Sequence, residues 1–137
     1  MDTKLLEELG KRIPGSSISR GMNSLSFSWP KPNNHWTDIS RFCMTVFTDE
    51  QPMFEYPNGC FDLLDKLERH KDLGGTGPDV SIQVSSWGKD GYLAERSVIN
   101  MNDSDYRTHV TEGKTRTEAI ARLFCEIMPV ISSEPNP

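Results

Sequence analysis

The chain has 137 residues, of which 35% are hydrophobic and 26% charged, and its formal net charge at pH 7 is −5. A chain of this length can bury a core without metals or disulfides, which predicts a single domain. The acidic balance and the lack of any Lys and Arg cluster argue against strong non-specific binding to nucleic acid, which depends on neutralising phosphates.

The N-terminal third, taken in chain order, predicts a helix and two extended segments. Residues 2–9 carry leucines on one helical face and predict a short helix. Residues 10–24 are rich in Gly, Ser and Pro, which indicates an irregular connection. Residues 25–29, LSFSW, alternate apolar and polar side chains as in a strand. Residues 38–48 fit helical spacing too, but their β-branched and aromatic composition favours a strand at about 41–48.

A helix followed by three strands is expected after residue 54. Asn58 can cap the helix, whose apolar side would carry Phe61, Leu64 and Leu67. Short polar turns separate the strands, which indicates antiparallel pairing. The three strands are predicted at residues 80–87, 92–101 and 105–112.

The segment EGKTRTEAIARLFCEIMP, residues 112–129, has the features of a complete helix. Thr115 can cap its first turn. Glu118 lies three residues later, where its side chain can accept a hydrogen bond from the backbone N–H of the capping residue. Pro129 stops the helix. Apolar side chains recur on one face at Ile120, Leu123, Phe124, Ile127 and Met128.

These elements predict an α+β fold. Its core would be a helix–three strands–helix unit at residues 58–128, with both helices packed on one face of an antiparallel sheet. Residues 1–53 would extend this fold with an N-terminal helix and strands, and residues 130–137 would form a frayed tail.

Catalytic and metal-binding motifs are not apparent in the sequence. The three histidines lie in different predicted elements without metal-ligand spacing, and no nucleophile–base pair follows from spacing. The GKT tripeptide at 113–115 has Thr108 where a phosphate loop needs its first glycine. We therefore predict no catalytic residue, no metal and no cofactor.

A binding surface is predicted on the sheet face that the helices would leave uncovered. The outward set of the last strand would be Arg107, His109 and Thr111. Trp36 and Trp87, in loops predicted nearby, are aromatic residues of the kind that dominate interface energetics. The predicted surface is thus Trp36, Trp87, Arg107 and His109. In the alternative interpretation both tryptophans pack at the edge of the hydrophobic core, and the N-terminal third covers this face of the sheet.

Residues 54–128 resemble the phage "ABA sandwich" domain family. The resemblance rests on the FEYP opening, the helix CFDLLDKLE, an alternating strand, and the final EGKTRTEAIARLFCEIM. In that family the last helix often begins with a glycine, a hydroxyl residue and an EA pair, matched here by Gly113, Thr115, Glu118 and Ala119. The resemblance implies a small bacteriophage or prophage protein, and it supplies no catalytic residues.

The helix–three strands–helix order is also similar to a double-stranded RNA-binding domain. That family places a run of lysines at the start of its last helix to grip phosphates. Here Arg116 is the one basic residue of that stretch, and Glu118 would repel a phosphate. The similarity therefore indicates shared topology more than shared function.

The leading functional hypothesis is a non-enzymatic accessory protein of a phage or prophage. It would work in the host cytoplasm by stoichiometric binding to a host or phage macromolecule, with inhibition of a host defence as one form. Widely spaced cysteines and the lack of a signal peptide or membrane span fit that compartment. The alternatives are an RNA-binding module and a small enzyme whose site assembles across a homodimer.

Overall fold

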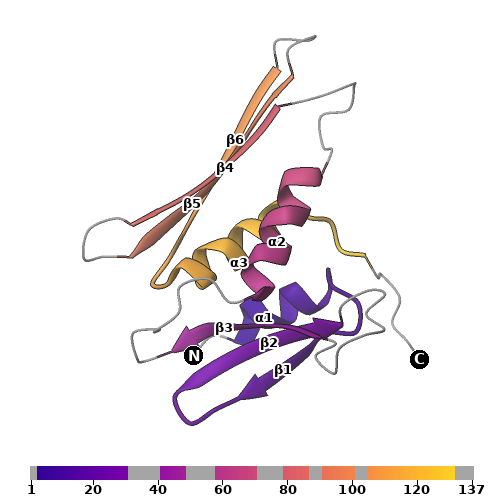
Figure 1. Ribbon diagram of the computed structural model, residues 1–137, viewed down its shortest axis with the longest axis vertical. Helices are drawn as coiled ribbons and strands as arrows, with labels where there is room; N and C mark the ends of the chain where they lie inside the picture. Colours follow the sequence, from indigo (N-terminus) through magenta and orange to yellow (C-terminus); the bar gives the residue numbers. More distant parts are fainter. Residues whose placement is uncertain are drawn as a thin grey trace.

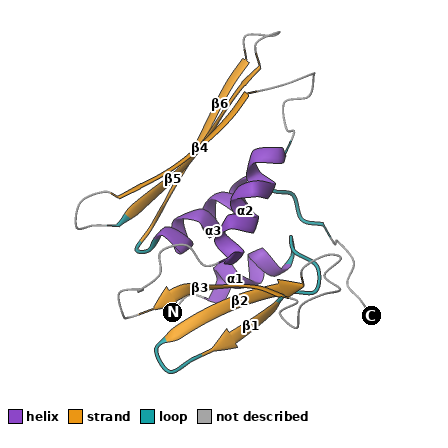
Figure 2. Cartoon of the chain, in the orientation of Figure 1, coloured by secondary structure: helices purple, strands orange, loops and turns teal. Residues whose placement is uncertain are grey.

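The computed structural model describes residues 3–30, 41–48, 58–70, 79–86, 91–100 and 105–131. These residues form three helices and two three-stranded antiparallel sheets, which confirms the α+β class. The helices lie in a layer between the two sheets (Figures 1 and 2). Both sheets therefore turn one face to the helices and the other face away from them.

The first sheet has the strand order β1-β2-β3, with β1 at Ser17–Arg20, β2 at Ser24–Pro30 and β3 at Arg41–Thr48. The predicted strand at 41–48 is confirmed, and Leu25, Phe27 and Trp29 are all buried, as the alternation in β2 predicts. The expectation that residues 10–24 are irregular throughout is wrong. A tight hairpin, closed by a hydrogen bond from Gly21 N to Ser24 O at 2.9 Å, lets the alternating sequence SISR pair with β2 as strand β1.

The second sheet lies within the predicted helix–three strands–helix unit. Its strands are β4 Asp79–Ser86, β5 Tyr92–Asn100 and β6 Asp105–Gly113, and they pair antiparallel in the order β4-β5-β6. The helices are α1 Thr3–Gly10, α2 Asn58–Arg69 and α3 Arg116–Ile127. Helix α3 packs on β5 and β6, α2 packs beside it on β4, and α1 packs on α3.

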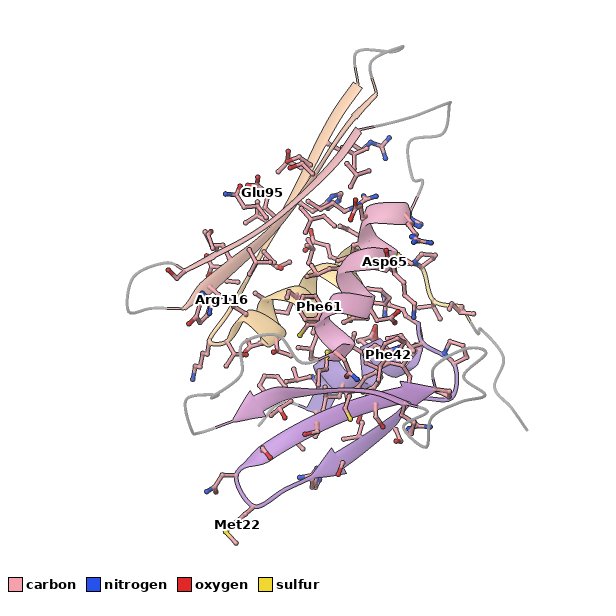
Figure 3. All side chains as sticks on the ribbon, viewed as in Figure 1. Met22, Phe42, Phe61, Asp65, Glu95 and Arg116 are labelled. Carbon is pink, nitrogen blue, oxygen red and sulfur yellow. The ribbon has the colours of Figure 1, made fainter. Side chains whose placement is uncertain are left out.

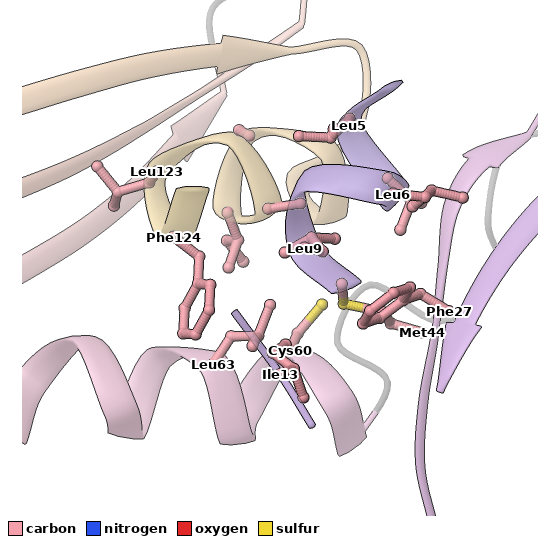
Figure 4. Packing of buried hydrophobic residues seen from close by; sticks show 14 of the residues in the cluster. Leu5, Leu6, Leu9, Ile13, Phe27, Met44, Cys60, Leu63, Leu123 and Phe124 are labelled. Carbon is pink, nitrogen blue, oxygen red and sulfur yellow. The ribbon is translucent and has the colours of Figure 1, made fainter. Parts of the chain in front are cut away.

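The buried apolar side chains form a cluster that draws on all three helices and on both sheets. Leu6 and Leu9 of α1 lie in the same cluster as Phe27 of the first sheet, and Phe124 of α3 points toward Leu63 of α2 (Figure 4). Burial of an aliphatic or aromatic side chain contributes about 1.5–3 kcal/mol. The helix layer is therefore where most of the stabilising burial takes place.

The N-terminus of α3 has the predicted cap. Thr115 Oγ1 accepts a hydrogen bond from Glu118 N at 3.1 Å, and Glu118 Oε1 accepts one from Lys114 N at 3.3 Å. The Glu118 carboxylate thus binds the backbone N–H of Lys114, the residue before the cap, rather than that of Thr115. Two backbone N–H groups at this end of the helix are satisfied by side chains as a result.

The predicted inner face of α2 is wrong at one position. Phe61 is 58% exposed, whereas Cys60, Leu63 and Leu67 are buried. The spacing 60, 63, 67 defines a helical stripe that turns Phe61 outward.

Asn58 also differs from its expected capping role, because its Oδ1 accepts a hydrogen bond from Cys43 N at 3.0 Å and so joins α2 to β3.

Candidate functional site

The sequence-predicted orientation of β6 is inverted in the structure. Residues paired across two antiparallel strands lie on the same face of the sheet. The β5 partners are buried beneath the helices, so the side chains that we expected to face outward lie on the helix side. The pairs are Ala94 with Thr111, Arg96 with His109 and Val98 with Arg107.

Thr111 shows why β6 takes this orientation. Its side chain is buried, and its Oγ1 donates to Ala119 O of α3 at 2.7 Å. This hydrogen bond satisfies a hydroxyl that burial would otherwise penalise. Val110, on the opposite face, is 47% exposed. A polar residue with a partner in α3 therefore occupies the inner position, and an apolar residue faces away.

The four residues of the predicted binding surface do not form a single described site. Trp36 and Trp87 lie outside the described residues. Arg107 is exposed and His109 is half-buried, and both lie on the helix side of β6. The Nδ1 atom of His109 is buried and has no hydrogen-bond partner. The role of these four residues in binding remains a prediction.

Arg96 is a buried residue that the sequence reading missed. Its side chain lies at the centre of β5, fully buried beneath the end of α2. Nε donates to Leu67 O at 2.8 Å, and Nη2 donates to His70 O at 2.6 Å. Carbonyl groups at a helix C-terminus lack intrahelical donors and carry partial negative charge. The guanidinium thus fixes the last turn of α2 to the second sheet. Ala94 and Val98 lie two residues before and after Arg96 and therefore share its face of the strand. Their apolar character was the signal in the sequence that position 96 faces inward.

A groove with a volume of about 830 Å³ lies between α1, α3 and the end of the β5–β6 pair, and we call it the α1–α3 groove. This volume is within the range of small-molecule sites. Its lining residues are Lys4, Leu5, Glu8, Tyr92, Thr111, Glu112, Gly113, Lys114, Glu118, Arg122, Cys125 and Glu126.

The wall formed by α3 is held by an internal ion pair. Glu118 is buried, and its Oε2 accepts from Arg122 Nε at 3.0 Å while Oε1 accepts from Lys114 N. Both carboxylate oxygens therefore have partners inside the protein. Glu118 positions the start of α3 and the Arg122 side chain, and Arg122 remains partly exposed along the groove.

The rims of the groove carry charges of both signs. Lys4 and Glu8 come from α1, while Glu112 and Lys114 come from the end of β6 and the turn after it. Glu118, Glu126 and Arg122 of α3 complete the charged lining. The groove is therefore lined by four carboxylates and three cations. Hydrogen bonds from Lys11 and Arg12 lower the pKa of Glu8, so its carboxylate is charged at neutral pH. The groove thus presents charges of both signs rather than a field of one sign.

An aromatic ring at the mouth of the groove is held by a cation. The Arg116 guanidinium carbon lies 4.4 Å from the centroid of the Tyr92 ring, a cation–π contact between the first turn of α3 and the start of β5 (Figure 3 labels Arg116). Tyr92 lines the groove and is partly exposed. The ring is a rigid, amphipathic surface beside the charged residues of the groove.

The thiol in the groove is poorly suited to act as a nucleophile. Burial raises the pKa of Cys125 to about 11, so the thiol is protonated at neutral pH. Within the described lining the groove has no histidine to act as a base. Nor do three His, Cys, Asp or Glu side chains converge as a metal site anywhere in the described part of the chain.

Comparisons of this chain with protein-family profiles, with curated proteins and with solved structures found no match. The resemblance to the phage "ABA sandwich" family thus remains a prediction from the sequence. Across the described residues, no helix combines the length and the apolar character needed to cross a membrane.

Proposed function

We propose that this protein is a non-enzymatic accessory protein of a phage or prophage that binds a protein partner stoichiometrically in the host cytoplasm. The α1–α3 groove is the observation that carries the proposal. Inhibition of a host defence protein is the form of binding that the phage resemblance favours.

The lining of the groove supports a polypeptide as the occupant. Four carboxylates and three cations line a partly apolar groove, together with the Tyr92 ring. A peptide segment can satisfy such a surface with charges of both signs and with its own N–H and C=O groups. A strongly anionic ligand would meet more carboxylates than cations there.

Reversing two exposed charges in the groove is expected to abolish capture of the partner. The variant is Glu112→Lys with Glu126→Lys, since both side chains are exposed and line the groove. Tagged protein would be recovered from infected cells, and co-purified proteins quantified by mass spectrometry. We expect a partner recovered in near-equal amounts with the wild type to fall at least tenfold with this variant, because charge mismatch in an interface costs several kcal/mol.

The matched control is Glu7→Lys with Glu68→Lys, which makes the same change of charge at exposed positions outside the groove lining. It should recover the partner as the wild type does. Both variants should unfold at the wild-type urea midpoint, since exposed substitutions usually change stability by less than about 0.5 kcal/mol. Equal recovery by the groove variant and the control would contradict the assignment of the groove.

Binding of double-stranded RNA is the second candidate function, favoured by one observation. The order α2-β4-β5-β6-α3, with both helices on one face of the sheet, is the topology to which the sequence is similar. The first turn of α3 is unfavourable for phosphates, because Arg116 stacks on Tyr92 and Glu118 is buried as an ion pair.

We expect no tight binding to a duplex of about 16 base pairs, the length that such RNA-binding domains span. Gel-shift titration at physiological salt would test this expectation, with a double-stranded RNA-binding domain as the positive control. Submicromolar binding that weakens steeply as salt is added would instead favour the RNA-binding function, because such a salt dependence reports phosphate contacts.

A further inference from the structure

The outer edge of β4 differs from the other sheet edges of the molecule. β4 pairs with β5 through eight consecutive residues without a bulge, and it has no second neighbour among the described strands. Every second residue of an edge strand directs its N–H and C=O away from the sheet. Natural proteins usually protect such edges with charges, proline, bulges or a covering element. The β4 sequence from 80 to 86, VSIQVSS, contains neither a charged residue nor proline.

Each of the other three edges has some protection. β1 is only four residues long and ends in Arg20. β3 has a register irregularity in its pairing with β2, and Asn58 of α2 takes up its Cys43 N–H. β6 carries several charged or titratable side chains, including Arg107 and Glu112. The β4 edge is thus the one edge of the two described sheets that is long and regular and has seven consecutive uncharged residues, 80–86.

The side chains of β4 also favour an added strand. Val80, Ile82 and Val84 lie on the helix side and are only partly buried, although Ile82 and Val84 pack against the core. On the opposite face Ser81, Gln83 and Ser85 are exposed. An added strand that alternates in the same way would complete the burial of the three apolar residues and keep the polar ones in water.

We propose that a second copy of this chain occupies the β4 edge, so that two β4 strands pair antiparallel about Ile82 and form a six-stranded sheet. A two-fold axis perpendicular to the sheet keeps the helices of both copies on one side. Residue numbers paired across this axis add up to 164, so inner residues meet inner residues. Val80 lies opposite Val84 of the other copy, Ile82 opposite Ile82, and Ser81 opposite Gln83.

Charge and fit favour this occupant and this register. Centring the pair on Ile82 gives three apolar pairs on the helix side, whereas centring it on Gln83 gives two and places Val80 opposite Ser86. The chain carries a net charge of −5, which opposes self-association in general. The strand itself has one charged residue, Asp79, and the two copies of Asp79 would be about 20 Å apart at opposite ends of the pair. The edge is therefore a place where two acidic copies meet without direct repulsion.

Two double variants at the same positions test this pairing. Ser81→Lys with Gln83→Lys places like charges directly opposite each other twice across the axis, whereas Ser81→Glu with Gln83→Lys places opposite charges there. Gln83 faces Glu95 across the β4–β5 pair on the outer face, where Glu95 points away from the helices (Figure 3), so a lysine at 83 also suits the single chain. Folding would be checked by far-UV circular dichroism and urea unfolding.

Sedimentation and light scattering over a range of concentrations would give the mass and the dissociation constant. We expect the wild type to have the mass of two chains at micromolar concentration. The double-lysine variant should raise the dissociation constant roughly tenfold or more, although its two added positive charges reduce the magnitude of the net negative charge from −5 to −3. The Glu–Lys variant, with an unchanged net charge, should dimerise at least as tightly as the wild type.

Three outcomes would overturn the proposal. The first is a wild type that is monomeric at high micromolar concentration, including one that uses the edge only for a strand from a different protein. The second is a dimer that the double-lysine variant leaves intact, which would place the contact elsewhere. The third is loss of the dimer in both double variants, which would exclude pairing about Ile82.

Discussion

Replacing Trp29 with alanine is expected to lower the free energy of unfolding by about 3–5 kcal/mol, as found for large aromatic residues in protein cores. Trp29 is 2% exposed and joins β2 to α2. Its Nε1 donates to Asp62 Oδ2 at 2.8 Å, and its ring lies 5.7 Å from both Phe27 and Phe42, measured between centroids. Truncation would leave a cavity between the first sheet and the helix layer and also remove a hydrogen bond to a carboxylate.

The conservative variant Trp29→Phe separates these two contributions. It keeps much of the aromatic volume and loses the hydrogen bond to Asp62, so we expect a smaller loss of about 1.5–3 kcal/mol. Urea unfolding followed by circular dichroism would measure both variants without depending on tryptophan fluorescence. An unchanged unfolding midpoint for Trp29→Ala would show that β2 is not packed against α2 as described.

Replacing Arg96 with methionine is expected to lower the free energy of unfolding by about 2–4 kcal/mol. A hydrogen bond from a charged donor contributes about 1.5–3 kcal/mol, and Arg96 donates to both Leu67 O and His70 O. Removal of the buried charge itself is favourable and offsets part of the loss. Arg96→Lys should also be destabilising, because a single ammonium lacks the forked geometry that reaches both carbonyls.

Hydrogen exchange would locate the effect of Arg96→Met. Amides in the last turn of α2 should exchange faster, because the carbonyls that anchor this turn to the sheet lose their donor. The control is Arg69→Met at the same end of the helix, where the side chain is 78% exposed and pairs with Asp65 at the surface. That change should cost no more than about 1 kcal/mol. Wild-type stability and exchange in Arg96→Met would exclude an anchoring role for this residue.

The parts of the fold that depend on local sequence could be predicted, and α3 is the clearest case. Thr115 and Glu118 lie three residues apart, so their reciprocal hydrogen bonds depend only on the first turn of the helix. The strand at 41–48 was likewise predicted from its composition, although its spacing also fitted a helix. Local chemistry was sufficient in both cases.

Which side chains face the core depends on contacts with segments distant in the sequence, and this was harder to predict. Either alternating set of β6 side chains could face the core. The pairing of β6 with β5 beneath α3 determines which set does so. Arg96 resembles a solvent-exposed residue until the end of α2 is placed above it. Phe61 has the expected apolar character but falls outside the stripe defined by its buried neighbours.

The α1–α3 groove could not be predicted as a site from the sequence. Its charged residues are individually typical of solvent-exposed faces, and they come from segments separated by most of the chain. Lys4 and Glu8 approach Glu112 and Lys114 only because α1 packs on α3. The local pattern around each residue carries no information about that arrangement. The binding residues that we predicted came instead from one strand and two loops.

The central position of α3 makes completion of the core depend on a segment that is translated after the strands of both sheets. This helix packs against α1, α2 and strands of both sheets, and Arg12 Nε donates to Met128 O across a separation of 116 residues. A ribosome releases the N-terminal part first, so both sheets emerge before the helix that covers their apolar faces. Until residues 116–127 leave the exit tunnel, the nascent chain holds surfaces that chaperones recognise. Slow translation of the codons for residues 116–127 would prolong that exposed stage.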